Sequence, residues 1–529
     1  MFWSFRRRVA PAVVALAGAQ FAAAQADRVE EIVVTADFRE ARIEDLPISV
    51  SVLDREELER TTQQHFEEAI RRIPNLNLSG EGSRARYFQL RGVGELEQYD
   101  GAPNPSIGFI VDDIDFSGLG SIATLFDIER VEVLRGPQGT RYGANALGGL
   151  IYMRSQAPPA DLSADFESTT GTDGTRAFGA AVGGPVTEAL RYRASVHTHE
   201  NDGFRDNVFL GRDDTYGRDE LTARGKLAWS PNEAVRIDFA GLHVDIDNGY
   251  DAWAVDNGWS TYSDHPGRDA QRSTAGSVRV QAELDAVDIV SITGFADTDA
   301  VFSFDADWGN PAYWAPYTYD YVTANDRERR TLSQELRLLS KPGAIVDGRG
   351  DWLVGVYVVD VDERNDQRTL GAYADPFCGP ACSFDTNTAV RSDYRATNLA
   401  GFGQVALSLN DRLGVTAGLR WEQRSADYDD SNANAFSPDD DMLGGELAFA
   451  WRLRERRSAY LRLARGYKAG GFNVSLAGVD FSTVDNVNLS PSNIEFDAES
   501  LMSIEAGIRA ASADGRLRAD VGVFFAQRD

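Results

Sequence analysis

The sequence predicts a membrane β-barrel preceded by an N-terminal mixed α/β domain, and three observations lead to this fold class. From Ala160 onward, strand-like segments of about ten residues are separated alternately by short turns and long polar loops. Apolar and polar side chains alternate within these segments. An export signal begins the chain, and no internal stretch reaches the roughly 20 uninterrupted apolar residues of a membrane helix. Such a protein crosses a membrane with strands.

The first 26 residues have the pattern of a secretory signal peptide. Three arginines at positions 6–8 precede an apolar run at 9–16, and a small-residue stretch ends at Ala26. We expect cleavage after Ala26. An N-terminal membrane anchor is the alternative, but the apolar run is short for one.

The exported chain is strongly acidic. Loss of the signal leaves 50 basic and 82 acidic side chains, a formal charge of −32. Nucleic acid is therefore a poor candidate partner. The acidity favours a solvated surface that keeps an exported protein soluble, and attraction of cationic metal complexes is the alternative.

The chain has two cysteines, Cys378 and Cys382, in the run Cys-Gly-Pro-Ala-Cys. In an oxidising compartment this spacing predicts a loop disulfide. A thiolate metal site would need two more ligands nearby. His197 and His199 share one strand face without a third ligand, so we expect no metal site and no cofactor. No nucleophile elbow, phosphate loop or metal-binding helix motif indicates an enzyme.

The barrel segments allow a strand count. Seven tight-turn signals and the opening strand give fifteen strands. At 190–199 the even positions should face lipid and the odd positions the lumen. A soluble β-sandwich also alternates, but it rarely has loops of 25 to 30 residues on one side only.

The long loops should lie outside the cell, and two of them are rich in aromatic residues. Trp253, Trp259, Trp308 and Trp314 are candidate substrate-binding residues there, because such rings stack on sugars or aromatic siderophores. Interfacial aromatic girdles at the strand ends are the alternative explanation.

Residues 37–155 predict a compact mixed α/β domain, with a strand near 48–53 and a helical stretch at 56–72. Just before it stands a short β-prone run that could add to the sheet edge of another protein. This run comprises Ile32, Val33, Val34, Thr35 and Ala36.

With these motifs the chain resembles the TonB-dependent receptors. The resemblance rests on the β-prone run, on Leu-Arg-Gly at 90–92, on the acidic turn at 112–113 and on Arg-Gly-Pro at 135–137. It continues at 465–473 and 504–508. The chain departs from the family pattern at Arg141, where an apolar residue is usual, and at 152–154.

The resemblance implies a 22-stranded type of outer-membrane barrel with a plug domain in its lumen. The implied division is a signal peptide at 1–26, a TonB-box segment at 27–36, the plug at 37–155 and the barrel at 160–529. TonB, powered by inner-membrane energising proteins, would pair with residues 32–36 and remodel the plug. A signalling receptor would need a further domain before the box.

The implied function is energised import of a scarce large nutrient by a monomer in the outer membrane. A ferric siderophore is the expected cargo, and a carbohydrate, cobalamin or another metal chelate is the alternative. A passive diffusion porin is a candidate from a different class, but it predicts neither a box nor a plug.

Two sets of site residues follow. We expect Arg91 and Arg135 to anchor the plug by ion pairing inside the barrel, with Glu505 on the lumenal face of a strand as one partner, unless they only cap plug turns. We expect Arg84, Arg86 and Tyr99 at the plug apex to bind an anionic chelate, with ordinary solvated loop residues as the alternative.

We also expect this chain to be a fragment that lacks about seven C-terminal strands. Fifteen is odd, whereas bacterial single-chain barrels have an even number of strands. The last segment also lacks the terminal aromatic residue that the resembling family uses as an assembly signal. A gene that continues in frame past the codon for Asp529 would confirm this expectation.

Overall fold

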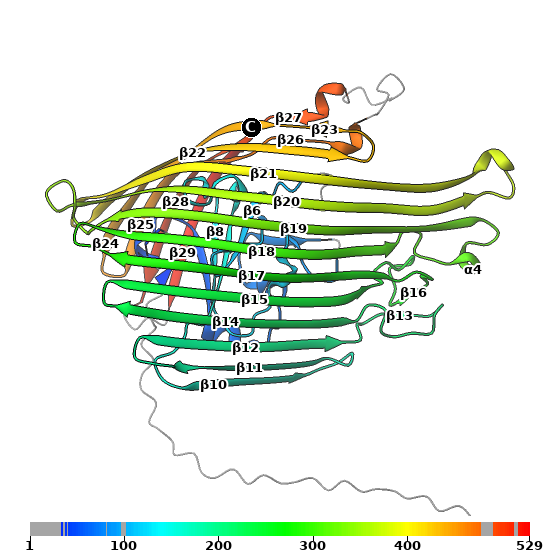
Figure 1. Cartoon of the computed structure of the whole chain (residues 1–529), viewed down its shortest axis with the longest axis horizontal. Coiled ribbons are helices and arrows are strands. Elements are labelled where there is room, and N and C mark those ends of the chain that lie inside the picture. Colours follow the sequence, from blue (N-terminus) through cyan, green and yellow to red (C-terminus); the bar gives the residue numbers. More distant parts are fainter. Residues whose placement is uncertain are drawn as a thin grey trace, which may run out of the picture.

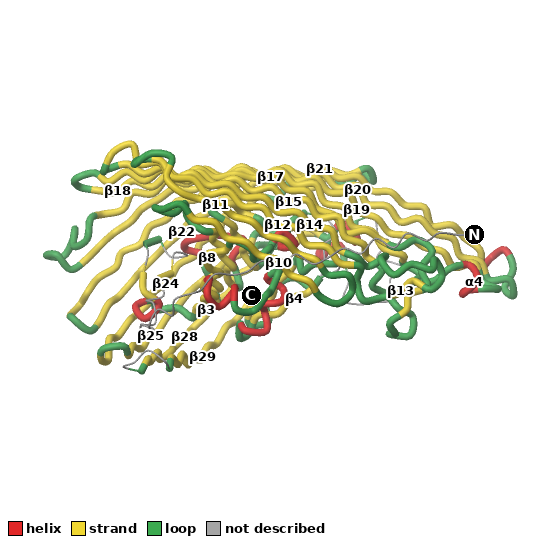
Figure 2. Tube along the Cα trace, turned by 90° about the horizontal axis from the view of Figure 1, so that it is seen from below, coloured by secondary structure: helices red, strands yellow, loops and turns green. Residues whose placement is uncertain are grey.

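The structure is a computed structural model that describes residues 33–34, 38–39, 41–80, 82–96, 102–477, 490–512 and 517–529. A compact N-terminal domain, here called the plug, lies on the concave side of a large curved antiparallel sheet (Figure 1, Figure 2). Within these ranges, no helix is long and apolar enough to span a membrane. The predicted signal peptide lies outside the described residues.

The plug is built on a five-stranded mixed sheet in the order β3-β8-β9-β6-β7. Its strands are β3 (Val50–Asp54), β6 (Ile107–Val111), β7 (Ile114–Asp115), β8 (Ile128–Arg135) and β9 (Gly149–Ser155). β6 and β9 are parallel, and the other neighbours are antiparallel. Two small ladders accompany it, β1 (Val33–Val34) with β2 (Ala41–Arg42) and β4 (Leu76–Ser79) with β5 (Tyr87–Leu90).

The helices of the described chain are short. The α-helices are α1 (Arg55–Glu59), α2 (Phe66–Ala69), α3 (Gly139–Tyr142) and α4 (Pro311–Trp314). The 3-10 helices are η1 (Ile43–Asp45), η2 (Ile70–Arg72), η3 (Gly120–Ile122), η4 (Gly143–Ala146), η5 (Pro380–Cys382), η6 (Val474–Leu476) and η8 (Pro491–Asn493).

The single helical stretch expected at 56–72 is wrong, because the chain breaks between α1 and α2. Thr62 has a φ of 50°, a left-handed conformation that ends a helix. His65 then caps α2, since its Nδ1 accepts from the backbone N–H of Glu67 at 3.2 Å. The break places His65 and Glu67 beside the barrel wall.

One hydrophobic cluster joins the plug to the barrel. Phe66, Phe88 and Phe109 form its centre and are at most 3 % exposed. The cluster extends to Val244 and Ile246 on the barrel wall. Burial of each such large side chain contributes about 1.5–3 kcal/mol. The plug is therefore held to this side of the wall by apolar packing.

In the part of the chain that the structure describes, the large sheet runs through fifteen strands in chain order, as the turn count predicts. They are β10 (Ser163–Thr170), β11 (Arg176–Pro185), β12 (Leu190–Asn201), β14 (Arg218–Asn232), β15 (Val235–Tyr250), β17 (Gly267–Glu283), β18 (Val287–Asp305), β19 (Thr318–Ser340), β20 (Gly350–Ala374), β21 (Ser383–Asn410), β22 (Leu413–Asp430), β24 (Asp439–Arg454), β25 (Arg457–Lys468), β28 (Glu499–Ala511) and β29 (Arg518–Arg528). β10 and β29 are the two outermost strands of this path.

Short ladders extend the sheet at its long-loop end. β23 (Ala435–Phe436) pairs with β22. β13 (Asp206–Asn207) pairs with β16 (Ser260–Thr261), and β26 (Gly471–Phe472) pairs with β27 (Glu495–Phe496).

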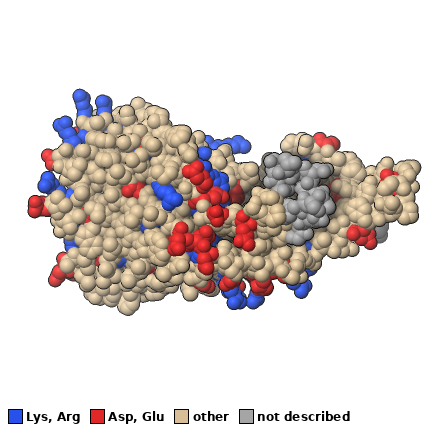
Figure 3. All heavy atoms as spheres, turned by 90° about the horizontal axis from the view of Figure 1, so that it is seen from above, with Lys and Arg blue, Asp and Glu red and all other residues tan. Residues whose placement is uncertain are grey.

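Alternation sorts the strand side chains into a lumenal and an outer face, as predicted. In β12, Arg193, His197 and His199 are buried, whereas Ala194 and Val196 point outward and are exposed. Figure 3 shows a broad area of outer surface with few charges, bordered on both sides by charged side chains, with a cluster of Asp and Glu on one side. This is the pattern of a band that faces lipid.

The strands in the middle of the sheet are much longer than the ten residues expected. β20 has 25 residues and β21 has 28, and their pairing continues to Ala374 opposite Ser383. Residues 319 and 321 lie within β19, near its start at Thr318. Backbone hydrogen bonding between residues far apart in sequence extends this hairpin, which local patterns do not reveal. A disulfide between Cys378 and Cys382 closes its tip, and their Cα atoms are 5.7 Å apart.

Candidate functional site

Arg84 is buried and links the plug to the barrel. The expectation that this residue is exposed to cargo is therefore corrected. Its side chain is 1 % exposed. Its Nε donates to Glu220 on β14 at 2.7 Å, and its Nη1 donates to Glu67 of α2 at 2.6 Å. Nη2 also lies 3.5 Å from Nδ1 of His199. The two carboxylates satisfy this guanidinium, so it is not presented to solvent.

Burial and charge shift the titration of the plug groups in this link. Burial, together with the neighbouring charge of Arg84, lowers the pKa of His65 to about 4. Burial alone would raise the pKa of Glu67. Its pKa is held at about 2 by His65, which is protonated in the acid range where Glu67 titrates, and by the charges of Arg84 and Arg218. At neutral pH His65 is therefore neutral and Glu67 is charged, which suits an ion pair with Arg84.

Arg86 makes a second buried link between plug and barrel, so its expected exposure to cargo is also corrected. It is 7 % exposed and forms an ion pair with Asp269 of β17. Its guanidinium carbon lies 5.4 Å from the ring centre of Phe302. The Oδ2 of Asp269 also accepts from the hydroxyl of Ser83 at 2.8 Å. Tyr99, the third residue of the expected apical set, lies outside the described residues.

The structure brings Arg91 and Glu505 together. Arg91 Nη1 lies 2.5 Å from Oε2 of Glu505 on β28. The other oxygen of Glu505 accepts from the hydroxyl of Tyr460 at 2.6 Å and from the backbone N–H of Ser49 at 2.9 Å. This carboxylate thus joins two plug segments to two neighbouring barrel strands.

Among the described residues Arg135 hydrogen-bonds within the plug, and its expected ion pairing with the barrel is not observed. Its Nε donates to the carbonyl of Pro74 at 2.9 Å, and its Nη2 donates to the hydroxyl of Ser51 at 2.7 Å. Burial lowers the pKa of Arg135, and the charge of nearby Arg91 lowers it further. Because Arg91 already occupies the carboxylate, Arg135 braces the plug internally.

The expected TonB-binding run is described only at Val33 and Val34, and Ile32, Thr35 and Ala36 lie outside the described residues. The backbone of β1 pairs antiparallel with β2, with Val33 opposite Arg42. Four residues after Val34, Phe38 is buried against the barrel wall and stacks on Phe402 of β21 at 5.2 Å. The chain beside β1 is therefore anchored to the barrel.

A cationic cluster that sequence reasoning missed lies at the plug apex. The lumenal residues Arg327 and Arg329 of β19 and Arg424 of β22 surround the plug segment 102–105. Arg424 Nη2 donates to the carbonyl of Pro103 at 3.3 Å, and Arg329 pairs with Glu363 at 2.5 Å. Small cavities of about 30 and 40 Å³ separate these groups. The sequence signal for this cluster was the presence of two arginines two residues apart in a strand, a spacing that places both side chains on one face.

The four tryptophans lie in the loops and helix at the long-loop end. Trp253 and Trp308 stack with ring centres 5.3 Å apart. Trp314 donates from Nε1 to Asp307 at 2.9 Å. Trp259 packs edge-on against Phe204 and is 74 % exposed. These rings form an aromatic surface above the lumen.

The residues described contain no group of three or more His, Cys, Asp or Glu side chains arranged to hold a metal ion. His197 instead has its Nε2 2.8 Å from Oε1 of Gln64, and its ring stacks on Phe126. These contacts are structural.

Two family descriptions match the chain. Residues 42–150 match "TonB-dependent Receptor Plug Domain", and residues 193–529 match "TonB dependent receptor-like, beta-barrel". The second match alone covers more than half of the chain.

Curated relatives and solved structures agree with these matches. The pesticin receptor of Yersinia enterocolitica serotype O:8 is 26% identical over 486 residues, which are 89% of this chain and 67% of that protein. The ferric yersiniabactin uptake receptor FyuA from Yersinia pestis has a TM-score of 0.73 and 22% identity, over 91% of this chain and 72% of that one. The ferripyoverdine receptor of Pseudomonas aeruginosa, bound to ferripyoverdine, has a TM-score of 0.71 and 16% identity, over 94% and 65%. The chain therefore belongs to the TonB-dependent receptors, which are outer-membrane receptors and not enzymes.

Proposed function

We propose that this receptor imports an anionic ferric chelate of the siderophore class, with energy delivered by TonB. The observation that carries the proposal is the arginine cluster at the plug apex, formed by Arg327, Arg329 and Arg424. Guanidinium groups bind carboxylate and catecholate oxygens through charge-assisted hydrogen bonds. The relatives named for iron chelates support this cargo class.

In this proposal the aromatic surface makes the first contact with cargo. Trp253, Trp259, Trp308 and Trp314 lie at the long-loop end, which faces outside the cell, and their rings offer stacking surfaces. The acidic side chains seen at this end (Figure 3) face solvent and are screened beyond roughly 8 Å at physiological salt. The buried arginines are screened much less and dominate at contact distance.

Energy coupling would use β1. TonB would add a strand to the backbone of Val33 and Val34 in the periplasm and pull the chain that leads to the plug. No bond in the cargo changes. The residues of this chain bind the chelate, exclude water and transmit the force.

The cargo class is tested by binding to the purified receptor. A negatively charged ferric tris-catecholate, a neutral ferric hydroxamate, cobalamin and a maltooligosaccharide are compared. We expect the anionic chelate to bind best and Arg329→Gln to weaken it about tenfold or more, because a hydrogen bond to a charged group contributes about 1.5–3 kcal/mol.

Arg330→Gln is the matched control. Arg330 is the next residue on β19, but it points outward, is 72% exposed and pairs with Asp297. Arg330→Gln should leave binding of the anionic chelate unchanged. Preferential binding of cobalamin or the oligosaccharide, or equal losses in both variants, would contradict the proposed cargo.

A further inference from the structure

The lumenal face of β19 lines a series of neighbouring cavities from the plug apex to the opposite end of the plug. Its inward residues, from Arg327 to Leu339, alternate with outward ones. At a rise of about 3.3 Å per residue they span roughly 40 Å. The lining residues on β19 are Arg327, Arg329, Thr331, Ser333, Glu335, Arg337 and Leu339. We call this plug–barrel interface the β19 seam.

Neighbouring cavities of the β19 seam share walls. The upper two, of about 30 and 40 Å³, share Ser117 and Arg329. The second shares Asp115 and Asn145 with a third of about 60 Å³. The third shares Arg337 with the lowest cavity, which encloses about 660 Å³. The lowest cavity is large enough for a drug-sized ligand.

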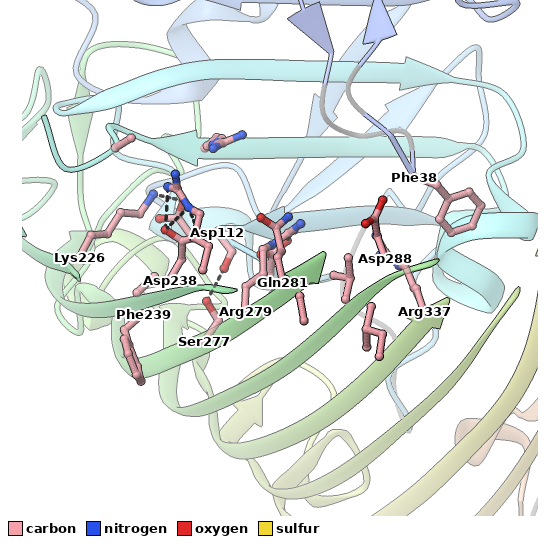
Figure 4. Close-up of a pocket in the computed structure, with 18 of the residues that line it drawn as sticks. Phe38, Asp112, Lys226, Asp238, Phe239, Ser277, Arg279, Gln281, Asp288 and Arg337 are labelled. Carbon is pink, nitrogen blue, oxygen red and sulfur yellow. Dashed lines mark hydrogen bonds and ion pairs between the residues drawn. The ribbon is translucent and has the colours of Figure 1, made fainter. Parts of the chain in front are cut away.

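Charged groups converge on the lowest cavity from both sides (Figure 4). Asp113 at the plug's β6–β7 turn pairs with Arg279 of β17 at 2.5 Å, and Asp112 pairs with Lys226 of β14 at 2.7 Å. Every cation of these pairs already holds a carboxylate. An anionic chelate can therefore replace a carboxylate at each cation in turn. No single site then binds the chelate so tightly that it cannot leave, which passage through a pore requires.

The ion pairs that Arg84 and Arg91 make elsewhere between plug and barrel are more deeply buried than Asp113–Arg279 and Asp112–Lys226 of the seam. The hydrophobic cluster packs the plug on β15, and ion pairs from Arg84 and Arg91 join it to β14 and β28. The β19 seam lies in the middle of the strand order, far from the outermost strands β10 and β29. It is a line of cavities whose lining is largely polar and charged.

Phe38 connects the β19 seam to the energy-coupling strand. Its ring lies 5.1 Å from the guanidinium carbon of Arg141 and 5.2 Å from that of Arg337, and both arginines line the seam. The next residue, Arg39, donates from Nη2 to the carbonyl of Ser340 at the end of β19 at 2.7 Å. A pull on β1 therefore acts first on the contacts that close the lower end of the seam.

We propose that cargo crosses the barrel along the β19 seam, which opens from its periplasmic end when TonB withdraws Phe38. The β6–β7 hairpin then moves away from β19, while α3 stays against β22. The cargo is an anionic chelate, so this inference rests on the proposed function for its ligand. The position of the opening is tested separately.

The main test compares two disulfide locks. A Cβ at Gly294 of β18 would lie 3.9 Å from Cα of Ile114 on β7, so Ile114→Cys with Gly294→Cys ties the hairpin to the wall beside the seam. A Cβ at Gly418 of β22 would lie 2.7 Å from Cγ2 of Thr140 on α3, so Thr140→Cys with Gly418→Cys ties the plug away from it. The two native cysteines are already paired with each other.

Cells with each lock are assayed for binding and uptake of the 55Fe-labelled ferric tris-catecholate. We expect the seam lock to reduce uptake to the level of cells without TonB, with binding retained and uptake restored by reductant. The control lock should leave uptake near that of the unmodified receptor under the same conditions. An unchanged rate with the seam lock, or equal loss with both locks, overturns the proposed route.

A second measurement requires no imported chelate. Ser333→Cys places a thiol in the β19 seam, and Thr222→Cys places one on β14, where Thr222 contacts Thr124 of the plug at 3.0 Å. A charged maleimide should label position 333 several-fold faster in cells with TonB than without it, and position 222 equally slowly in both. Faster labelling at 222 alone overturns the route, whereas failure of the chelate to bind counts against the cargo class only.

Discussion

Replacement of Val33 by proline is expected to reduce energised uptake to the background of cells that lack TonB. The backbone of Val33 is part of β1, which pairs with β2 opposite Arg42. An added strand from TonB needs the backbone N–H groups of this segment, and proline removes one and fixes φ. Initial rates of 55Fe-chelate uptake measure the effect.

Binding of the chelate to cells should be unchanged in Val33→Pro, because the arginine cluster at the plug apex lies at the other end of the plug. Val33→Ile is the matched control, since it keeps the N–H group and a β-branched side chain. Normal uptake by the proline variant, or loss of surface binding together with uptake, would show that this strand does not couple energy.

Arg84→Ala is expected to loosen the plug from the barrel. The change leaves Glu67 and Glu220 buried without their shared cation. Breaking a buried ion pair in this way costs about 3–5 kcal/mol. Hydrogen exchange of the purified receptor should show faster exchange in α2 and in the segment around residues 83–86. Faster exchange there reports easier local opening.

Two further variants separate this effect from a general loss of charge. Arg212→Ala removes an exposed pair with Asp214, which contributes at most about 1 kcal/mol, so its plug should exchange normally. Arg84→Met combined with Glu67→Gln and Glu220→Gln should exchange more slowly than Arg84→Ala, because no uncompensated charge remains buried. Unchanged exchange in Arg84→Ala would show that other contacts hold this region.

The barrel was predictable from sequence because its signals are local. Alternation within a strand and the tight turns between strands each depend on a few neighbouring residues, and together they give the fifteen strands observed. Strand length was not predictable in the same way. The β20–β21 hairpin continues through pairing that depends on both strands at once, and the sequence there also resembles a polar loop.

The same difference between local and long-range signals applies to the site residues. Arg91 belongs to a plug motif and Glu505 has a lumenal position by alternation, so their proximity follows from two local patterns. Arg84 and Arg86 were misassigned because their partners lie 136 and 183 residues away in sequence. A basic residue in a loop has the same local pattern whether it meets cargo or a carboxylate on the barrel wall. Only the fold distinguishes the two cases.

We propose that this receptor imports an anionic ferric chelate with energy from TonB. The most direct measurement is the initial rate of 55Fe-labelled ferric tris-catecholate uptake, at several concentrations, in cells that carry the receptor gene with and without TonB. We expect saturable uptake that requires the receptor and falls to background without TonB or after the proton gradient is collapsed. Uptake that persists without TonB and rises linearly with concentration would contradict it, because that is the behaviour of a passive pore.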